Sequence, residues 1–555
     1  MANLNKSKTI FAFTSPRTIE KIIPEIQILV NGYEGKKWDN DTQKSFFSDL
    51  FESEFYEGKE KPKDITFAAR DRITRAPKAL GFVDLKPVIK LTEVGQQLLS
   101  GKRINEVIAR QLLKFQLPSP YHKVPEERGF NVRPYLELLR IVKVIGNISK
   151  TEIAIFFVQL TNYKKFDEIV QAIRRYRVDY SAHTGNKKAF IDLIFTKEVL
   201  KIYEEDIKNE KFKGRQDNDT TLQDFVARKK SNHVDYADAL VRYLRATQLI
   251  TFDKNFRIII APSRNAEVDF ILQNIERKAL SFKNGKTFKT YLFSPNTLEL
   301  LTDKRENVEK QLDKIGAGYD EKATVEDLKD LLEKTETDRV NQAIAQTEKG
   351  LKDYKEFDDI LSIFDKIDEK IVPDPSLYLE WNIWRSMVMV NYAKKVQGNF
   401  KLDLDGVPLN TAGAKIPDIE IDYESFKMIV EVTMSSGQKQ YDMEGEPVPR
   451  HFGNAKSLTD KPVYCLFIAP KISEGTLAHF FALNQKAPKF YGGQTNIVPM
   501  NLENFRQFIT TAKNSNFNNP NNLQGYLDNL LKQNRTIDDE AEWFRNIERS
   551  VSQWI

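Results

Sequence analysis

Two acidic residues in the C-terminal part of the chain have the spacing of a metal-dependent phosphodiester site. Residues 417–423 alternate apolar and polar side chains and residues 428–433 form an apolar run, so both predict short strands joined by a turn at 424–425. This hairpin would bring Asp418 and Glu431 together at one end of a sheet. Converging carboxylates suit Mg²⁺, which prefers oxygen ligands and shares its remaining coordination positions with water and phosphate. A cation held there could activate water and stabilise charge on a phosphodiester.

The order Pro-Asp, strand and Glu is the PD-(D/E)xK nuclease pattern with one departure, because Thr433 stands where the pattern has Lys. The same order also occurs in ordinary hairpins that carry a surface Asp. The position of Glu431 favours the nuclease, since a lone charge after a buried apolar run is costly unless it is paired or bound to a metal.

Further acids lie near this hairpin in the sequence. A predicted helix at 377–385 carries Glu380 among aromatic residues, and residues 443–451 contain Glu444 and Glu446 and end in Arg450-His451. Each has an ordinary alternative, because Glu380 could pair with Arg385 and the other two acids could simply be solvated.

Composition limits the classes of protein that the chain can be. Its 555 residues are too many for one core and predict three or four domains. The single cysteine, Cys465, lies in a buried-strand pattern, which leaves no disulfide or thiolate metal site, and five His residues make zinc chemistry improbable. No apolar run is long enough to span a membrane and the start has no signal-peptide pattern, so we expect a cytoplasmic protein without membrane contact.

The distribution of charge is more informative than the net charge of +5. Basic clusters at 70–72, 174–177, 228–230 and 242–245 lie in the N-terminal half, whereas acids concentrate between 299 and 370. Each cluster alone could be a solvated helix face. Several in one half favour a surface that binds phosphates.

The order of predicted elements indicates a multidomain protein. Helices at 18–31 (with a Pro kink) and 41–54 precede strands at 79–83 and 88–91, which is typical of a winged-helix-like DNA-recognition subdomain over 1–125. Helices at 133–146, 149–160, 167–180 and 235–246, a loop at 208–220 and a hairpin at 249–260 predict a second such subdomain over 126–295. Charged helices at 307–315 and 324–332, too poor in apolar residues for a core of their own, predict a helical linker over 296–350. Alternating strands and helices predict an α/β PD-(D/E)xK restriction-endonuclease-like domain over 351–555.

The chain resembles the AlwI-type type IIS restriction endonucleases, a family that includes strand-specific nicking endonucleases. The resemblance rests on Glu380-Trp381, Lys415-Ile416-Pro417-Asp418, Glu431-Val432-Thr433, Met443-Glu444, Glu446-Pro447-Val448 and Arg450-His451, and in the N-terminal half on 15–17, 20–21, 69–72 and 81–83. It implies a large subunit that recognises a short asymmetric site in double-stranded DNA and cuts outside it with Mg²⁺, for which Mn²⁺ could substitute. It also implies a small catalytic subunit, or transient dimerisation, when both strands are cut.

The resemblance transfers the family's catalytic acids to Glu380, Asp418, Glu431 and Glu444, with His451 nearby. In the mechanism that we expect, Asp418, Glu431 and the carbonyl of Val432 hold the metal. Glu444 holds or orients a water, and Glu380 completes the outer shell or a second metal site. His451 could bond the phosphate or the departing 3′ oxygen, or have only a structural role. Lys439 and Lys456 are candidates to replace the missing lysine.

Residues that read DNA are expected in the N-terminal half. An Arg in the major groove can bond both acceptors of guanine, and Arg17, Arg70 and Arg72 are the candidates, with Asp71 fixing their rotamers or accepting from cytosine. A local Arg70–Asp71 salt bridge is the alternative. Lys229 and Lys230 of the 228–230 cluster are further DNA-binding candidates.

Two other functions compete with a restriction endonuclease. A DNA-repair or recombination nuclease would share the acids and lack a fixed site. A non-catalytic winged-helix DNA-binding protein would need the basic half alone.

Overall fold

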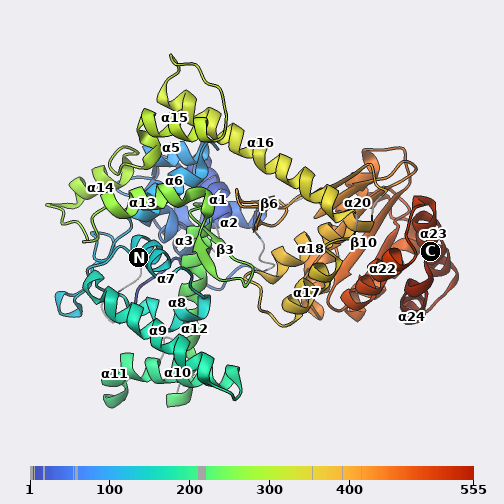
Figure 1. Ribbon diagram of the computed structural model, residues 1–555, viewed down its shortest axis with the longest axis horizontal. Helices are drawn as coiled ribbons and strands as arrows, with labels where there is room; N and C mark the ends of the chain where they lie inside the picture. Colours follow the sequence, from blue (N-terminus) through green and yellow to red (C-terminus); the bar gives the residue numbers. More distant parts are fainter. Residues whose placement is uncertain are drawn as a thin grey trace. The chain divides into compact units, whose positions relative to one another are not determined.

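The computed structural model describes residues 4, 7–16, 19–53, 55–56, 60–210, 221–352, 354–390, 392–413 and 416–555 (Figure 1). They divide into two compact units, Met1–Glu336 and Thr337–Ile555, called unit 1 and unit 2 below. None of the described helices combines the length and the apolar character needed to cross a bilayer.

Unit 1 is mainly helical, in agreement with the sequence. Its principal helices are α1 Ile19–Tyr33, α2 Asn40–Glu52, α3 Ile65–Ile73, α5 Glu93–Leu99, α6 Ile104–Lys114, α7 Pro134–Ile145, α8 Lys150–Ile155, α9 Phe166–Ala182, α10 Lys187–Ile202, α12 Leu222–Arg245, α13 Asn265–Asn274, α14 Gly285–Phe293 and α15 Arg305–Lys314. Side-chain oxygens at Asp39, Asp64, Thr92 and Ser149 cap four of these helices.

The hairpin predicted at 249–260 is present, whereas the strand predicted at 79–83 is wrong except at Val83, because Ala79 ends the short helix α4 Ala76–Ala79. Strands β1 Val83–Asp84 and β2 Lys90–Leu91 pair antiparallel, as do β3 Ile250–Phe252 and β4 Ile258–Ile260. The assignment of winged helices to these hairpins stays a prediction. Of the loop predicted at 208–220, residues 211–220 lie outside the described residues.

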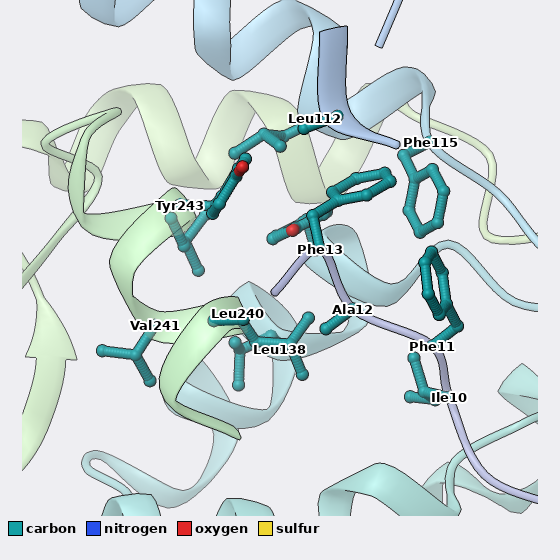
Figure 2. Packing of buried hydrophobic residues seen from close by; sticks show 14 of the residues in the cluster. Ile10, Phe11, Ala12, Phe13, Leu112, Phe115, Leu138, Leu240, Val241 and Tyr243 are labelled. Carbon is teal, nitrogen blue, oxygen red and sulfur yellow. The ribbon is translucent and has the colours of Figure 1, made fainter. Parts of the chain in front are cut away.

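The core of unit 1 is built around an extended N-terminal segment. Residues 10–13 are buried between α6 and α12, and the amide of Ile10 donates to the carbonyl of Val158 over 2.8 Å. Figure 2 shows the ring of Phe13 beside those of Phe115 and Tyr243, with centroid distances of 4.8 and 5.8 Å. This segment therefore ties helices that are distant in the sequence into one core.

The charged segment after residue 296 is built into unit 1 as far as Glu336. Here α15 and the start of α16 (Val325–Leu351) enclose a small cluster of Val308, Leu312, Leu328 and Leu332, so the expectation that this segment has no core is wrong. Ion pairs also hold this segment to α6, among them Arg110–Asp303 at 2.7 Å. The domain boundaries predicted at 125, 295 and 350 remain predictions.

Unit 2 contains a five-stranded mixed sheet, drawn in orange around β10 in Figure 1. Its order is β11-β10-β9-β8-β5, in which β9, β10 and β11 are parallel and β8 runs antiparallel to both β9 and β5. The strands are β5 Lys395–Gly398, β8 Ile419–Asp422, β9 Lys427–Val432, β10 Val463–Ala469 and β11 Ile497–Asn501. A separate hairpin of β6 Lys401–Leu402 and β7 Pro408–Asn410 was not predicted.

Helices cover both faces of this sheet. The helices of unit 2 are α17 Phe357–Asp368, α18 Pro375–Val390, α19 Gln438–Glu444, α20 Pro447–Ser457, α21 Glu474–Lys486, α22 Leu502–Asn514, α23 Pro520–Thr536 and α24 Glu540–Ser550. Of these, α18, α20, α21, α22 and α23 make the main contacts with the strands. On one face Ile429, Cys465 and Phe467 pack with Phe452 of α20 and Phe480 of α21. Contacts of α22 with β10 and β11 place it on the sheet as well. Every residue of β10 is consequently buried, as expected of a central parallel strand.

Candidate active site

The β8–β9 hairpin brings the first two predicted acids together. Ile419 pairs with Val430, so extending this antiparallel register by one residue puts Asp418 opposite Glu431. Directly opposed residues project to the same side of a sheet. The amide of Val432 donates to Asp418 Oδ2 over 2.7 Å, which fixes the Asp418 carboxyl at the C-terminal end of β9.

A residue that the sequence analysis missed holds the Pro417–Asp418 turn. The side-chain amide of Asn399 donates to the carbonyl of Pro417 over 2.7 Å, and its backbone amide donates to the carbonyl of Asp418 over 2.9 Å. No sequence signal marks Asn399 apart from its place directly after β5.

Glu431 is held by a histidine from the helix that covers the sheet. His451 on α20 places its Nδ1 at 2.8 Å from Glu431 Oε1, and both side chains are buried. Burial, together with the charge of Arg450, lowers the pKa of His451 to about 4, so the ring is neutral at pH 7. Its Nε2 is buried and has no hydrogen-bond partner. An atom of this kind is available to a ligand of the site.

Glu444 ends α19 beside the residue that replaces the usual lysine. A hydrogen bond links the Thr433 hydroxyl to the Glu444 carboxyl. Burial raises the pKa of Glu444 and this hydrogen bond opposes the rise. Thr433 therefore takes part in the cluster as a hydrogen-bonding group instead of a cation.

Glu380 reaches the same cluster from α18. Its side chain is only 5% exposed, and its Oε2 accepts from the amide of Ala412 over 3.3 Å. The alternative pairing with Arg385 is wrong, since that guanidinium binds Asp359 over 2.7 Å and also Glu356.

The four carboxyls affect one another electrostatically. Burial, and then the neighbouring acids, raise the pKa values of Glu380, Asp418 and Glu431 well above the ordinary range. For Glu380 the neighbour is chiefly Asp418, and for Asp418 it is chiefly Glu431. Within the described residues, none of the four forms a salt bridge with a Lys or Arg. The cluster thus consists of buried acids that no Lys or Arg side chain of the described residues pairs with directly.

The donor chemistry of the cluster fits a hard divalent cation. Carboxylate oxygens are joined at the end of β9 by the backbone of Val432, and such oxygens are the ligands that Mg²⁺ prefers. A cation would offset the mutual repulsion that raises the pKa values. Among the described residues, no three His, Cys, Asp or Glu side chains are close enough together to hold a metal ion as they stand.

The two lysines considered as substitutes differ in their surroundings. Lys456 donates to the carbonyls of Gly492 and Gln494, both over 3.0 Å, so it is engaged away from the carboxyls. Lys439 is exposed on α19. Lys415, part of the motif before Asp418, lies outside the described residues.

The predicted DNA-reading residues in α3 have protein partners. Arg72 pairs with buried Glu25 and lies over the ring of Tyr56, 5.0 Å from its centroid. Asp71 pairs with Arg75, so the Arg70–Asp71 salt bridge is not formed, and Arg70 is exposed. As DNA contacts, these residues remain predictions.

The other DNA-binding candidates lie elsewhere. Lys229 lies 4.3 Å from the ring centroid of Tyr203, and Lys230 pairs with Asp192 over 2.7 Å. Arg17 lies outside the described residues. The structure brings the catalytic candidates into one cluster, whereas the DNA-binding candidates stay dispersed over unit 1.

Comparison with known proteins gives the chain its family. The model of the AlwI restriction endonuclease family matches residues 78–508. Among curated proteins none matches the chain. Two solved structures are similar over parts of it. The small subunit of the heterodimeric restriction endonuclease R.BspD6I is 28% identical, with 35% of this chain and 98% of that chain covered and a TM-score of 0.31. The BpuJ1 endonuclease binding domain, in complex with pyrene- and phenanthrene-modified DNA, is 16% identical, with 51% and 93% covered and a TM-score of 0.32.

The family match includes the whole carboxylate cluster, from Glu380 to His451, and also most of unit 1 after α3. The chain belongs to the AlwI restriction endonuclease family.

Proposed function

We propose that the chain is a type IIS site-specific endonuclease that binds a short asymmetric site in double-stranded DNA and hydrolyses a phosphodiester outside it. Unit 1 would read the site and unit 2 would cut. The observation that carries the proposal is the convergence of four carboxyls from three separate stretches of unit 2, without a cationic side chain of the described residues bridging them.

The oxygen donors of this cluster are of the type that Mg²⁺ prefers, and Mn²⁺ could substitute. Asp418, Glu431, Glu444 and the carbonyl of Val432 would hold it. When bound, the cation would supply charge stabilisation at the scissile phosphate and lower the pKa of water.

The chain's own residues position the reacting groups. The Val432 amide orients Asp418, and His451 orients Glu431 through its Nδ1. Glu444, hydrogen-bonded to the Thr433 hydroxyl, would orient the attacking water, and Glu380 would complete the outer shell or a second metal site. With Nδ1 donating to Glu431, the unpartnered Nε2 of the neutral ring is an acceptor available to water, and a bond to the phosphate or to the departing 3′ oxygen would require the protonated ring. Such outer contacts typically change activity by about 10- to 100-fold.

The recognition half of the proposal rests on unit 1. Exposed Arg70 is the best-placed of the α3 candidates, because Arg72 and Asp71 are already held by Glu25 and Arg75. We propose that the isolated chain nicks one strand, and that a small catalytic subunit or transient dimerisation supplies the second cut.

Substitution of the cluster tests the catalytic half. Asp418→Ala and Glu431→Ala should each reduce plasmid cleavage in Mg²⁺ by at least roughly 1,000-fold, because several kcal/mol of transition-state stabilisation are lost. Specific binding, measured by band shift in EDTA, should be retained. Glu424→Ala is the control, since this exposed acid lies in the turn at the opposite end of the same hairpin. Full-rate cutting by either cluster variant would reject the assignment.

Sequencing of both product ends tests whether cleavage is site-specific and whether one strand or both are cut. A single offset from one recurring sequence supports a type IIS enzyme, and an end on one strand alone supports nicking. Products without a constant offset would indicate a repair nuclease instead.

A further inference from the structure

A strongly exposed aromatic residue lies close to the carboxylate cluster. The connection from α21 to β11 contains a short turn, Lys489–Tyr491, whose Phe490 side chain is 78% exposed. Burying an aromatic side chain is favourable, so leaving this one in water forgoes that gain.

The turn is firmly held on the helix that carries His451. Lys456 of α20 donates to the carbonyls of Gly492 and Gln494, and the amide of Gly493 donates to the carbonyl of Pro488 over 3.0 Å. The turn also packs tightly on α20, because a Cβ at Gly453 would lie only 3.1 Å from the backbone of Tyr491. Phe490 is therefore presented on a fixed support.

Arg450 affects the pKa of residues in both the turn and the carboxylate cluster, which indicates that the two lie near each other. Burial and the acid Glu446 raise the pKa of Tyr491, and the charge of Arg450 opposes the rise. Arg450 also lowers the pKa of Glu431. Arg450 thus lies within electrostatic range of both the catalytic carboxyl and the ring next to Phe490, whose centroid is 5.0 Å from that of Tyr491.

The charges around Phe490 suit a polyanion. Lys486 and Lys489 are exposed on either side of Pro488. Arg450 on α20 is partly exposed and pairs with Glu446 over 3.0 Å. Phosphates of a duplex lying over the cluster would meet these cations, and the aromatic ring would face the bases or sugars between them.

We propose that Phe490 is a positioning residue that inserts at, or stacks on, the base step next to the scissile phosphate of duplex DNA. The proposal rests on the proposed function. An apolar wedge that opens a base step costs a few kcal/mol of unstacking and recovers it through contacts that the distorted duplex permits. Its effect here would be to bring the scissile phosphate onto the carboxylates.

The test compares Phe490→Ala with Leu458→Ala in the full-length protein. Leu458 directly follows α20 and is also 78% exposed, so it controls for loss of an equally exposed apolar side chain. Single-turnover cleavage is measured on an intact duplex and on the same duplex with an abasic position beside the mapped cut, where stacking is already lost.

For Phe490→Ala we expect cleavage of the intact duplex to slow by roughly 5- to 150-fold, the range expected when one stacked base is lost. The abasic duplex should restore the rate, and Phe490→Trp should cut the intact duplex normally. Leu458→Ala should match the wild type on both substrates, and melting temperatures should be unchanged.

Wild-type rates for Phe490→Ala on the intact duplex would overturn the proposal, as would a defect that the abasic duplex does not relieve. A variant that cuts normally but no longer binds a second polypeptide would also overturn it, and would identify the turn as a protein contact. If the wild type cuts no DNA, the proposed function itself fails, which is a different result.

Discussion

The carboxyl of Asp418 accepts a hydrogen bond from Val432 and is repelled by Glu431, so two opposing effects act on one side chain. Burial and repulsion outweigh the hydrogen bond, because the net shift of the Asp418 pKa is upward. Without a bound cation, keeping these carboxyls buried next to one another therefore lowers the stability of the folded protein at neutral pH. This is a common situation at functional sites.

Removing that charge should stabilise the metal-free protein at neutral pH. A carboxyl with a raised pKa binds more protons in the folded state, so its contribution to stability falls as pH rises from about 4, the unfolded pKa, through the folded pKa. Asp418→Asn keeps an oxygen acceptor for Val432 and does not titrate. We expect a higher melting temperature than the wild type at pH 7.5 in EDTA, with the difference vanishing near pH 4.

The size of this effect can be read from thermal melts, since about 1 kcal/mol corresponds to roughly 2–4 °C in a unit of this size. Added Mg²⁺ should stabilise the wild type more than the variant. Glu424→Gln, at the exposed turn, should show neither behaviour. A variant that melts below the wild type at every pH would contradict the explanation.

At the scale of elements, apolar periodicity located most of the fold. The hairpin of β8 and β9, the central strand β10 and helices such as α7 and α9 lie where the pattern predicts them. Two helices were predicted too short. Residues 235–246 were expected for α12, which begins at Leu222, and residues 324–332 for α16, which continues to Leu351. The extra turns of α16 are rich in Lys, Gln, Glu and Ala, which favour helix without an apolar stripe.

Close packing of α5 gives a prediction at this scale. A Cβ at Gly95 would lie 2.1 Å from the carbonyl oxygen of Phe82 and 2.7 Å from Leu91 Cδ1, so the helix and the β1–β2 hairpin could no longer meet. Gly95→Ala should destabilise unit 1 by roughly 1–3 kcal/mol in urea titrations.

Gly525 is the matched comparison. It is exposed within α23 with nothing within 4 Å of a Cβ, so Gly525→Ala should stabilise unit 2 by roughly 0.5–1 kcal/mol. Equal effects of the two substitutions would show that helix propensity, and not the contact with Phe82, decides the outcome at Gly95.

At the scale of the whole molecule, α16 is continuous across the boundary between the two units at residue 336. Its middle part is largely exposed, so it depends on its own hydrogen bonds. The proposed type IIS function requires a constant spacing between the recognition site and the cut. We therefore expect the integrity of α16 to affect where the chain cuts more than whether it binds.

Ala345→Pro tests this expectation. Proline in a helix interior removes a hydrogen bond and costs about 3 kcal/mol locally. Sequencing of product ends should show a broader range of cut positions, while site binding and the melting of each unit stay as in the wild type. Ala345→Gln, which preserves the helix, is the control. An unchanged single cut position in the proline variant would exclude a spacing role for α16.

The sequence by itself determined the local parts of this protein: the β8–β9 hairpin, the acids at its ends and the family resemblance, because alternation and residue type act over a few neighbouring positions. The resemblance also named Glu380, Glu444 and His451, but only the tertiary structure decided which atoms they contact at the hairpin. It alone decided that Arg72 and Asp71 are held by Glu25 and Arg75. These contacts depend on how helices pack on the sheet and on one another. Packing brings together segments that are far apart in the chain, and local sequence patterns do not predict which of them will be in contact.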